Sequence, residues 1–353
     1  MKILLKGLKW FGLLIGTLLF LVILAGLFFR LFGSTKQEPQ GELIKVDAVK
    51  LHINVAGEKS SMPTVVIEGG AGMATEYYHW LSEGLKEELR VVRYDRAGIG
   101  YSESSNTPRD PETIARELHT LLENAGESPP YILAGHSMGG PYIRVFAELY
   151  PDEVVGLFLL DATHPDRAQR IKSIPAETSM KFKSMIRLYD VQGVLADLGV
   201  MLMVDRVFGP ILPREMEGLP DTINNRTIDF LKDGKYIRAY GKEMKQYYSN
   251  LKRAGQFRDF GALPLRIVTN EVRTIPDETY EKYLKRGINL RANLEESLAL
   301  QKEYLKLSTN SQILLLKANH VSMFTEKANA DIICQEILKL QRQLSTNPLA
   351  QSN

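Results

Sequence analysis

The chain has 353 residues, enough for one large α/β domain with an insertion or for two modest domains. Its 44% hydrophobic and 24% charged residues are typical of a folded protein and argue against global disorder. The formal net charge is +2 and there is no basic tract, so we expect no nucleic-acid partner. The single cysteine, Cys334, excludes an intrachain disulfide and lies among apolar residues at helical spacing, which predicts burial.

The N-terminus is different in kind from the rest of the chain. From Trp10 to Phe29 the sequence is uncharged and overwhelmingly apolar. A run of roughly 20 residues matches the hydrocarbon thickness of a bilayer. The alternative is a cleaved signal peptide, but those have shorter apolar cores, and no convincing small-residue cleavage site follows Phe29. We therefore expect residues 1–32 to form an uncleaved anchor that spans the membrane at about 10–29.

The charges that flank this apolar run predict its orientation. Three lysines precede the run, whereas Arg30 and Lys36 follow it. The excess of positive charge favours an N-terminus in the cytoplasm and a folded domain on the other side of the membrane. The polar residues 33–42 are expected to form a short tether.

Beyond the tether, short apolar runs alternate with helical patterns, which is typical of parallel βαβ units. The expected strands are Ile44–Asp47 and Leu51–Val55 (an antiparallel hairpin), Thr64–Glu68, Leu89–Tyr94, Tyr131–Gly135, Val154–Leu160, Leu263–Thr269 and Gln312–Leu316. The expected helices are Thr75–Glu88, Pro111–Ala125, Met138–Leu149 and Ala328–Gln343. Residues 165–262 have mostly helical patterns, so we expect them to be inserted into a core made of 43–164 and 263–344. Residues 345–353 read as a polar tail.

A candidate nucleophile lies in the pentapeptide Gly-His-Ser-Met-Gly at 135–139. A serine hydroxyl is a weak nucleophile that must be held near a base and near donors for an oxyanion. The motif follows a predicted strand and begins a predicted helix, which is the context of a sharp turn that exposes its serine. The sequence therefore predicts that Ser137 is the nucleophile.

The donors for an oxyanion are expected from two backbone segments. Glu68 is followed by Gly-Gly-Ala-Gly at 69–72, and glycines let backbone N–H groups turn toward a bound oxygen. We predict that the N–H groups of Ala71 and Met138 form the oxyanion hole. The alternative is that the glycines only make a tight turn.

The general base is predicted to be His320, which lies just past the last expected strand and comes last in the order serine, acid, histidine. The other five histidines do not fit this order. Two carboxylates could orient His320: Asp161, directly after the strand Val154–Leu160, and Glu271, after the strand that ends at Thr269. Asp161 is favoured because it ends a wholly apolar strand, where a carboxylate has no obvious structural reason to be.

At these residues, over about 43–342, the chain resembles the α/β-hydrolase superfamily, in its serine-hydrolase branch with a helical lid. Residues 94–102, from Tyr94 to Ser102, look like the DRxGxGxS loop of these proteins, in which the resemblance gives Asp95 and Arg96 a structural role. It implies an α/β fold with a mostly parallel sheet flanked by helices, a helical lid at 165–262, and no metal or organic cofactor. One preceding transmembrane helix completes the expected architecture.

The sequence departs from this family at two positions. Asn270 and Glu271 stand where an aspartate usually follows the penultimate strand, which supports Asp161 as the acid. Asn319 stands where a glycine commonly precedes the histidine, so the shape of that loop is open.

Because the candidate nucleophile is a serine, the resemblance argues for ester, thioester or amide hydrolysis through an acyl-enzyme, and against dehalogenase or epoxide-hydrolase chemistry. We expect an apolar or amphiphilic acyl substrate for two reasons. The anchor places the site beside lipid, and the insertion carries apolar residues that could form an adaptable wall of the binding site. The alternative is that these residues simply pack the core of the insertion. These residues are Met180, Met185, Met201, Leu202 and Met203. Acyl transfer, peptidase activity and a catalytically silent binding protein on the same scaffold are the alternatives.

Overall fold

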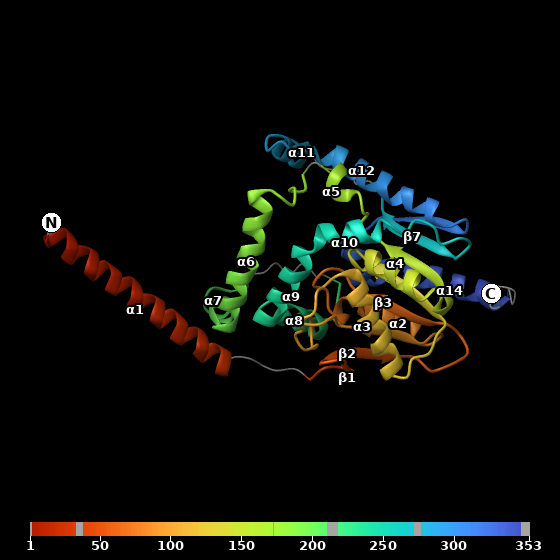
Figure 1. Cartoon of the computed structure of the whole chain (residues 1–353), viewed down its shortest axis with the longest axis horizontal. Helices are drawn as coiled ribbons and strands as arrows, with labels where there is room; N and C mark the ends of the chain where they lie inside the picture. Colours follow the sequence, from red (N-terminus) through yellow and green to blue (C-terminus); the bar gives the residue numbers. More distant parts are fainter. Residues whose placement is uncertain (1, 33–37, 172, 210–217, 272–276, 347–353) are drawn as a thin grey trace.

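An eight-stranded sheet forms the centre of the molecule (Figure 1). The computed structural model describes residues 2–32, 38–171, 173–209, 218–271 and 277–346. The strands follow the order β1-β2-β4-β3-β5-β6-β7-β8. β2 pairs antiparallel with β1 and β4, and the pairs from β4 to β8 are parallel. The predicted mostly parallel sheet with an opening antiparallel hairpin is therefore confirmed.

The observed strands lie close to the predicted ones. They are β1 Glu42–Val46, β2 Val49–Ala56, β3 Thr64–Glu68, β4 Val91–Tyr94, β5 Tyr131–His136, β6 Val154–Leu160, β7 Leu265–Asn270 and β8 Ser311–Leu316. β6 is apolar along its whole length because helices cover both faces of the sheet, so every side chain of this strand needs an apolar neighbour.

Helices cover the two faces of the sheet and form a separate apolar core with each. α3 (Pro111–Asn124) and α4 (Gly139–Leu149) pack on one face, where Leu118, Leu121 and Phe146 meet strand residues. α2 (His79–Leu85) and α14 (Lys327–Thr346) pack on the other, through Leu81, Leu85 and Ile337. This arrangement leaves the carboxyl ends of the parallel strands free to carry a site.

Two parts of the helical prediction differ from the structure. The segment predicted as one helix at 75–88 begins as a 3₁₀ turn, η1 (Thr75–Tyr78), followed by α2. Between β7 and β8 lie α11 (Asp277–Leu284), α12 (Leu290–Glu303) and the 3₁₀ turn η3 (Tyr304–Leu307), none of which the sequence patterns predicted. α12 buries only Leu300 and Gln301, so it carries little of the apolar periodicity by which a helix is recognised.

The insertion between β6 and β7 is mostly helical in its described residues. It comprises α5 (Arg167–Arg170), α6 (Met180–Asp197), α7 (Val200–Phe208), α8 (Asp221–Phe230), α9 (Gly234–Lys245) and α10 (Tyr247–Ala254). We call these six helices the helical insertion. α9 crosses above the loop after β3, where a side chain on Gly72 would meet Tyr236 and Tyr240.

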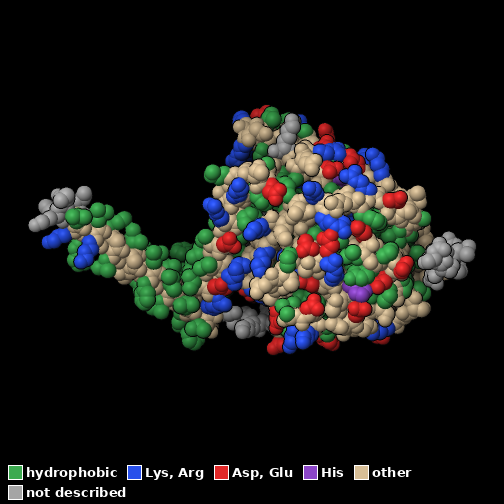
Figure 2. All heavy atoms as spheres, in the orientation of Figure 1, with side chains coloured by type: hydrophobic (Ala, Val, Ile, Leu, Met, Phe, Trp, Pro, Cys, Tyr) green, Lys and Arg blue, Asp and Glu red, His purple; other side chains and the backbone are tan. Residues whose placement is uncertain are grey.

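The N-terminal segment is one continuous helix, α1 (Lys2–Phe32), that leads away from the domain (Figure 1). Its stretch Leu5–Phe32 is long and apolar enough to cross a membrane, and only 6% of its most apolar window is buried. In Figure 2 its surface is almost wholly hydrophobic. Residues 33–37 of the predicted tether and 347–353 of the predicted tail lie outside the described residues.

Candidate active site

Ser137 occupies a strained turn between β5 and α4. Its φ of 51° lies in the left-handed region, which typically costs about 1–3 kcal/mol for a residue other than glycine. Hydrogen bonds offset this cost: the Ser137 N–H donates to Leu160 O (3.2 Å), and the Ser137 carbonyl accepts from the N–H groups of Gly140 (3.1 Å) and Thr163 (2.9 Å). A Cβ on Gly139 would overlap the Glu68 carbonyl, so this position requires glycine. The motif therefore encodes a turn that holds Ser137 at the carboxyl edge of the sheet.

Asp161 and His320, 159 residues apart in sequence, meet at this edge. His320 Nδ1 lies 2.6 Å from Asp161 Oδ2. Asp161 directly follows β6 with a φ of 42°, a second residue in the left-handed region. This conformation is held by its N–H, which donates to Val268 O on β7 (2.6 Å). Since Nδ1 faces Asp161, the other ring nitrogen, Nε2, is left for a reaction.

Two polar residues on the neighbouring strand β7 support the Asp161 carboxylate. Thr269 donates its hydroxyl hydrogen to Oδ1 (2.6 Å), and the Asn270 amide donates to Oδ2 (3.1 Å). Burial by itself would raise the pKa of Asp161, but the hydrogen bonds from His320 and Thr269 and the attraction of the His320 ring hold it below its ordinary value. Asp161 is therefore ionised at neutral pH and can orient and stabilise a protonated imidazole.

The alternative acid, Glu271, is in a different environment. It is exposed, and within the described residues no hydrogen bond joins its side chain to His320. Its N–H extends the sheet by donating to Leu316 O (2.9 Å). Asn270, its neighbour at the usual acid position, instead donates to Asp161.

Asn319, which stands where the resemblance expected glycine, shapes the histidine loop. Its side-chain oxygen accepts the N–H groups of Val321 (2.9 Å) and Ser322 (2.7 Å) and so begins α13 (Ser322–Thr325). In return, the Ser322 hydroxyl accepts the Asn319 N–H (2.8 Å). A glycine has no side chain to cap these groups, so here asparagine fixes the turn that carries His320.

The loop predicted to supply an oxyanion donor lies against the nucleophile. A Cβ on Gly70 would come 3.2 Å from Ser137 Cβ, and Ala71 packs beside Met138. The Gly70 N–H donates to the Tyr78 hydroxyl (2.9 Å) and the Gly72 N–H to Glu243 Oε2 (3.1 Å). Among the described residues, the Ala71 and Met138 N–H groups donate to no acceptor. Both are therefore free to bind a substrate oxygen.

A hydrogen-bond relay connects this loop to the histidine loop. The Tyr78 hydroxyl, which accepts the Gly70 N–H, lies 3.1 Å from His136 Nδ1, and His136 Nε2 lies 2.9 Å from the His320 carbonyl. Burial, together with the nearby His320 ring, lowers the pKa of His136 well below its usual value. A neutral His136 can donate from Nε2 to the His320 carbonyl and accept the Tyr78 hydroxyl hydrogen at Nδ1. The sequence pattern did not indicate this role for Tyr78.

A buried ion-pair network fixes the same loop from the other side. Arg96 donates to the carbonyls of Gly69 (2.7 Å) and Gly70 (2.6 Å) and to Glu68 Oε1 (2.5 Å). It also makes a bidentate pair with Glu243 on α9, at 2.7 and 3.0 Å. Arg96 and Glu243 are each 2% exposed. The helical insertion is therefore joined to the loop at 69–72 in two ways, through Arg96 and directly through the Gly72 N–H, although Arg96 and Glu243 are 147 positions apart.

The Ser137 hydroxyl lies 3.4 Å from the Thr163 hydroxyl, and in the described part of the chain no hydrogen bond joins it to His320. The His320 ring packs against the ring of His136, the residue before the serine, with a centroid distance of 4.5 Å and an angle of 45° between the ring planes. Hydrogen bonds between nucleophile and base are often long without substrate and tighten in the reacting complex. The sequence did not point to Thr163.

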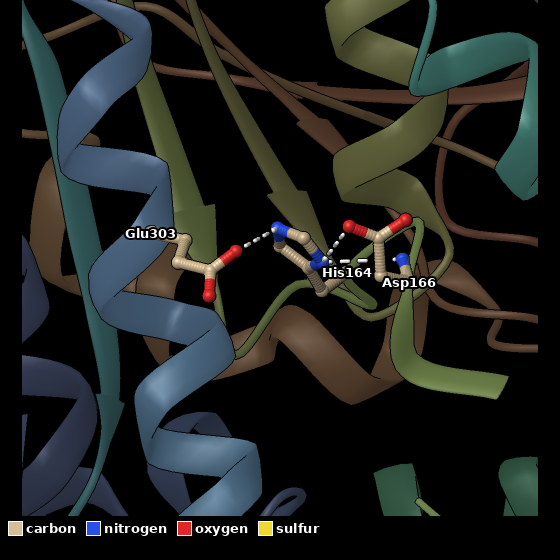
Figure 3. Close-up of side chains that lie close together, drawn as sticks. All are labelled: His164, Asp166 and Glu303. Carbon is tan, nitrogen blue, oxygen red and sulfur yellow. Dashed lines mark hydrogen bonds and ion pairs between the residues drawn. The ribbon is translucent and has the colours of Figure 1, made fainter. Parts of the chain in front are cut away.

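Next to Thr163, His164 forms a cluster with Asp166 and Glu303 (Figure 3). Figure 3 shows the two carboxylates at opposite ring nitrogens, and the Asp166 N–H already donates to Nδ1 (3.1 Å). Glu303 is also paired with Arg170 at 2.5 Å. Burial lowers the pKa of His164 to about 4, and the two carboxylates oppose this only in part. The neutral ring therefore lies between the loop after β6 and α12, with one carboxylate on each side.

The apolar residues expected to form an acyl-binding wall lie on α6 and α7. Met180 is 82% exposed on α6, and Met185 is half-buried on the same helix. Met201, Leu202 and Met203 lie on α7, which packs against α1 and α6. Their role as a wall stays a prediction.

Known proteins resemble both the sequence and the fold. Residues 63–195 match the family model described as alpha/beta hydrolase fold. The uncharacterized protein YbdG of Bacillus subtilis is 32% identical over 173 residues, which cover 47% of this chain and 53% of that protein. The human (lyso)-N-acylphosphatidylethanolamine lipase is 27% identical, over 51% of this chain and 52% of its own. The chain thus spans about half the length of these relatives.

Among solved structures, a thermophilic esterase from Thermogutta terrifontis superimposes with a TM-score of 0.56 at 18% identity, covering 86% of this chain and 99% of that one. An epoxide hydrolase and an acyltransferase described as putative are similar to a comparable degree. This level of identity shows the fold alone, so the likeness does not select one reaction.

Proposed function

Because this chain is an α/β-hydrolase-fold protein with a serine at its strand–helix turn, we propose that it is a membrane-anchored serine hydrolase. It cleaves a carboxylic ester, or a thioester or amide, of an apolar or amphiphilic acyl substrate. The observation that carries this proposal is the 2.6 Å contact between His320 Nδ1 and Asp161, at the edge of the sheet where Ser137 lies half-buried. The lipase name of the 27% identical human relative supports an acyl-lipid substrate.

In the proposed mechanism, Ser137 Oγ turns from Thr163 toward His320, attacks the acyl carbonyl and gives its proton to His320 Nε2. The negative charge that develops on the carbonyl oxygen is accepted by the N–H groups of Ala71 and Met138. Asp161 stabilises the protonated His320. When the tetrahedral intermediate collapses, the leaving alcohol takes the proton from His320 and the acyl group stays on Ser137. Water, activated by the same histidine, then releases the acid.

The membrane part of the proposal rests on α1. Its apolar length and near-complete exposure are those of a helix that is covered by lipid. The lysines before the span favour an N-terminus in the cytoplasm and the hydrolase domain on the other side.

The test is labelling of the full chain, in detergent and in bilayers, with a fluorophosphonate that phosphonylates activated serines. We expect labelling of the wild type, none in Ser137→Ala, and a rate lowered by at least about 10³-fold in His320→Ala. Ser60→Ala, an exposed serine outside the site, is the matched control and should label normally. Folded wild type that is not labelled in either medium would indicate a silent scaffold, and labelling that persists in Ser137→Ala would indicate another nucleophile. A series of esters of increasing acyl length would then define the substrate.

A further inference from the structure

The carboxyl-terminal turns of α1 contact the beginning of α7 in the helical insertion. The two backbones approach so closely that a Cβ on Gly26 would overlap the Leu198 carbonyl, and one on Gly199 would overlap the Gly26 carbonyl. One turn later, Arg30 donates to the Asp197 carbonyl and lies 3.5 Å from its carboxylate. Two glycines and a charged contact thus join the apolar helix to the insertion.

This junction determines the depth at which the helical insertion would lie in a bilayer. Gly26 lies inside the predicted span of about 10–29, roughly 4.5 Å from its end at a rise of ~1.5 Å per residue. The residues packed against it, Leu198 to Val200, must lie at the same depth. α7 therefore starts within the outer layer of the membrane if α1 crosses it.

The surface that adjoins this junction is unusually apolar for a water-facing helix pair. On α7, Val207 and Phe208 are 57% and 80% exposed. On α6, apolar residues recur along the exposed side at helical spacing, each at least 40% exposed. These are Leu188, Val191, Val194 and Leu195. We call these six residues the α6–α7 face.

Charge is distributed along α6 in a way that suits a lipid surface. Lys181, Lys183 and Arg187 are exposed on the same side of the helix as the apolar residues, and Asp190 lies at the edge of that side. Basic side chains gather over α6 in Figure 2, and Figure 1 shows α6 and α7 at the edge of the domain from which α1 leads away. An apolar strip with flanking lysine and arginine is typical of helices that lie in a membrane interface.

We propose that the α6–α7 face is buried in the interfacial layer of the same bilayer that α1 spans, with the basic residues of α6 at the phosphate groups. The partner is the phospholipid bilayer, because α7, which carries part of this face, packs against α1 at the Gly26–Gly199 contact. The inference rests on the anchoring part of the proposed function. It makes the helical insertion, which also contacts the loop at 69–72 through Glu243, the part of the enzyme that touches lipid.

The test uses the full chain in vesicles of phosphatidylcholine and phosphatidylglycerol, with single cysteines that carry an environment-sensitive fluorophore. Val191→Cys and Phe208→Cys report on the face, Leu19→Cys on the anchor, and Ile332→Cys on an exposed apolar position of α14. The unmodified chain is the blank, because burial raises the pKa of the Cys334 thiol to about 12 and keeps it from the label. Quenching is compared between lipid-attached nitroxides and aqueous iodide.

We expect labels at positions 191 and 208 to emit at shorter wavelength than the label at 332 and to be quenched by lipid nitroxides rather than iodide. The inference would be overturned if iodide quenched the labels at 191 and 208 as strongly as the label at 332. It would also be overturned if neither iodide nor the lipid nitroxides quenched these two labels, because that would indicate a second copy of the chain on this face. Absence of lipid quenching at 19 would instead refute the anchor. Fluorophosphonate labelling of the same samples reports the hydrolase separately.

Discussion

Replacing Glu243 by glutamine tests whether the helical insertion positions the loop at 69–72, which we propose holds an oxyanion donor and call the oxyanion loop. Glu243 Oε1 accepts Arg96 Nε (2.7 Å), and Oε2 accepts both Arg96 Nη2 (3.0 Å) and the Gly72 N–H (3.1 Å). Glutamine keeps the shape of the side chain but has only one oxygen, so its NH2 group would face either the Arg96 guanidinium or the Gly72 N–H, both of which are donors. Neither Arg96 nor the substituted side chain can turn to water, because both sites are 2% exposed.

The expected loss follows from this burial. Removing one partner of a buried ion pair typically costs 3–5 kcal/mol, roughly. Glu68 remains 2.5 Å from Arg96, so the guanidinium keeps one acidic partner after the substitution. We therefore expect the low end, about 3 kcal/mol, which corresponds to a Tm lower by roughly 4 °C for a chain of 353 residues. Because Arg96 also holds the Gly69 and Gly70 carbonyls, kcat should fall about tenfold, less than the loss of a whole oxyanion donor.

The measurements are thermal unfolding of the full chain in detergent and steady-state hydrolysis of p-nitrophenyl butyrate. Glu177→Gln, an exposed glutamate in the same insertion, is the matched control and should leave both quantities unchanged. A Tm within about 2 °C of wild type together with an unchanged kcat would refute the reasoning. A lower Tm with normal kcat would show that the pair stabilises the fold without positioning the loop.

Two further predictions concern the acid and the pH dependence. Asp161→Asn should lower kcat for an activated ester by about 10³–10⁴-fold, because the amide cannot stabilise a protonated His320, whereas Glu271→Gln should stay within about twofold; a larger loss in Glu271→Gln would contradict the assignment. His164 has a pKa of about 4 in the folded state, below its ordinary value of 6.5, so the folded state binds fewer protons than the unfolded state. The stability that this group contributes is therefore complete above pH 6.5 and declines as the pH falls toward 4. The decline is at most about 1.4 kcal/mol per pH unit. His164→Asn should therefore lose less Tm than wild type between about pH 7 and about pH 5, and an equal loss would show that another group controls the decline.

The sequence by itself determined the features whose signal is local. An apolar run of helical length predicted α1, and short apolar runs predicted strands such as β3 and β6, which the structure confirms with the same bounds. The motif around Ser137 predicted the strand–helix turn, because the close approach of backbones there demands glycine at fixed positions. Each of these signals depends on neighbours within a few residues of one another, so no tertiary information is needed to read it.

Only the tertiary structure decided which distant groups meet. Asp161 and Glu271 both follow strands at the same sheet edge, and the sequence could not separate them by position alone. Asp161 lies at 2.6 Å from His320 because its left-handed backbone turns it toward that ring while Thr269 and Asn270 hold its oxygens. Such a choice depends on the strand register and on single dihedral angles. Neither of these leaves a periodic trace in the sequence.

The same holds for Arg96 with Glu243 and for Gly26 with Gly199, each a contact between segments far apart in the chain. Burial decides their importance: an arginine at 2% exposure must be paired, and two backbones can touch only where side chains are absent. The sequence shows the residue types, but the folded chain alone shows that α9 of the insertion contacts the loop at 69–72 and that α7 contacts the apolar helix α1.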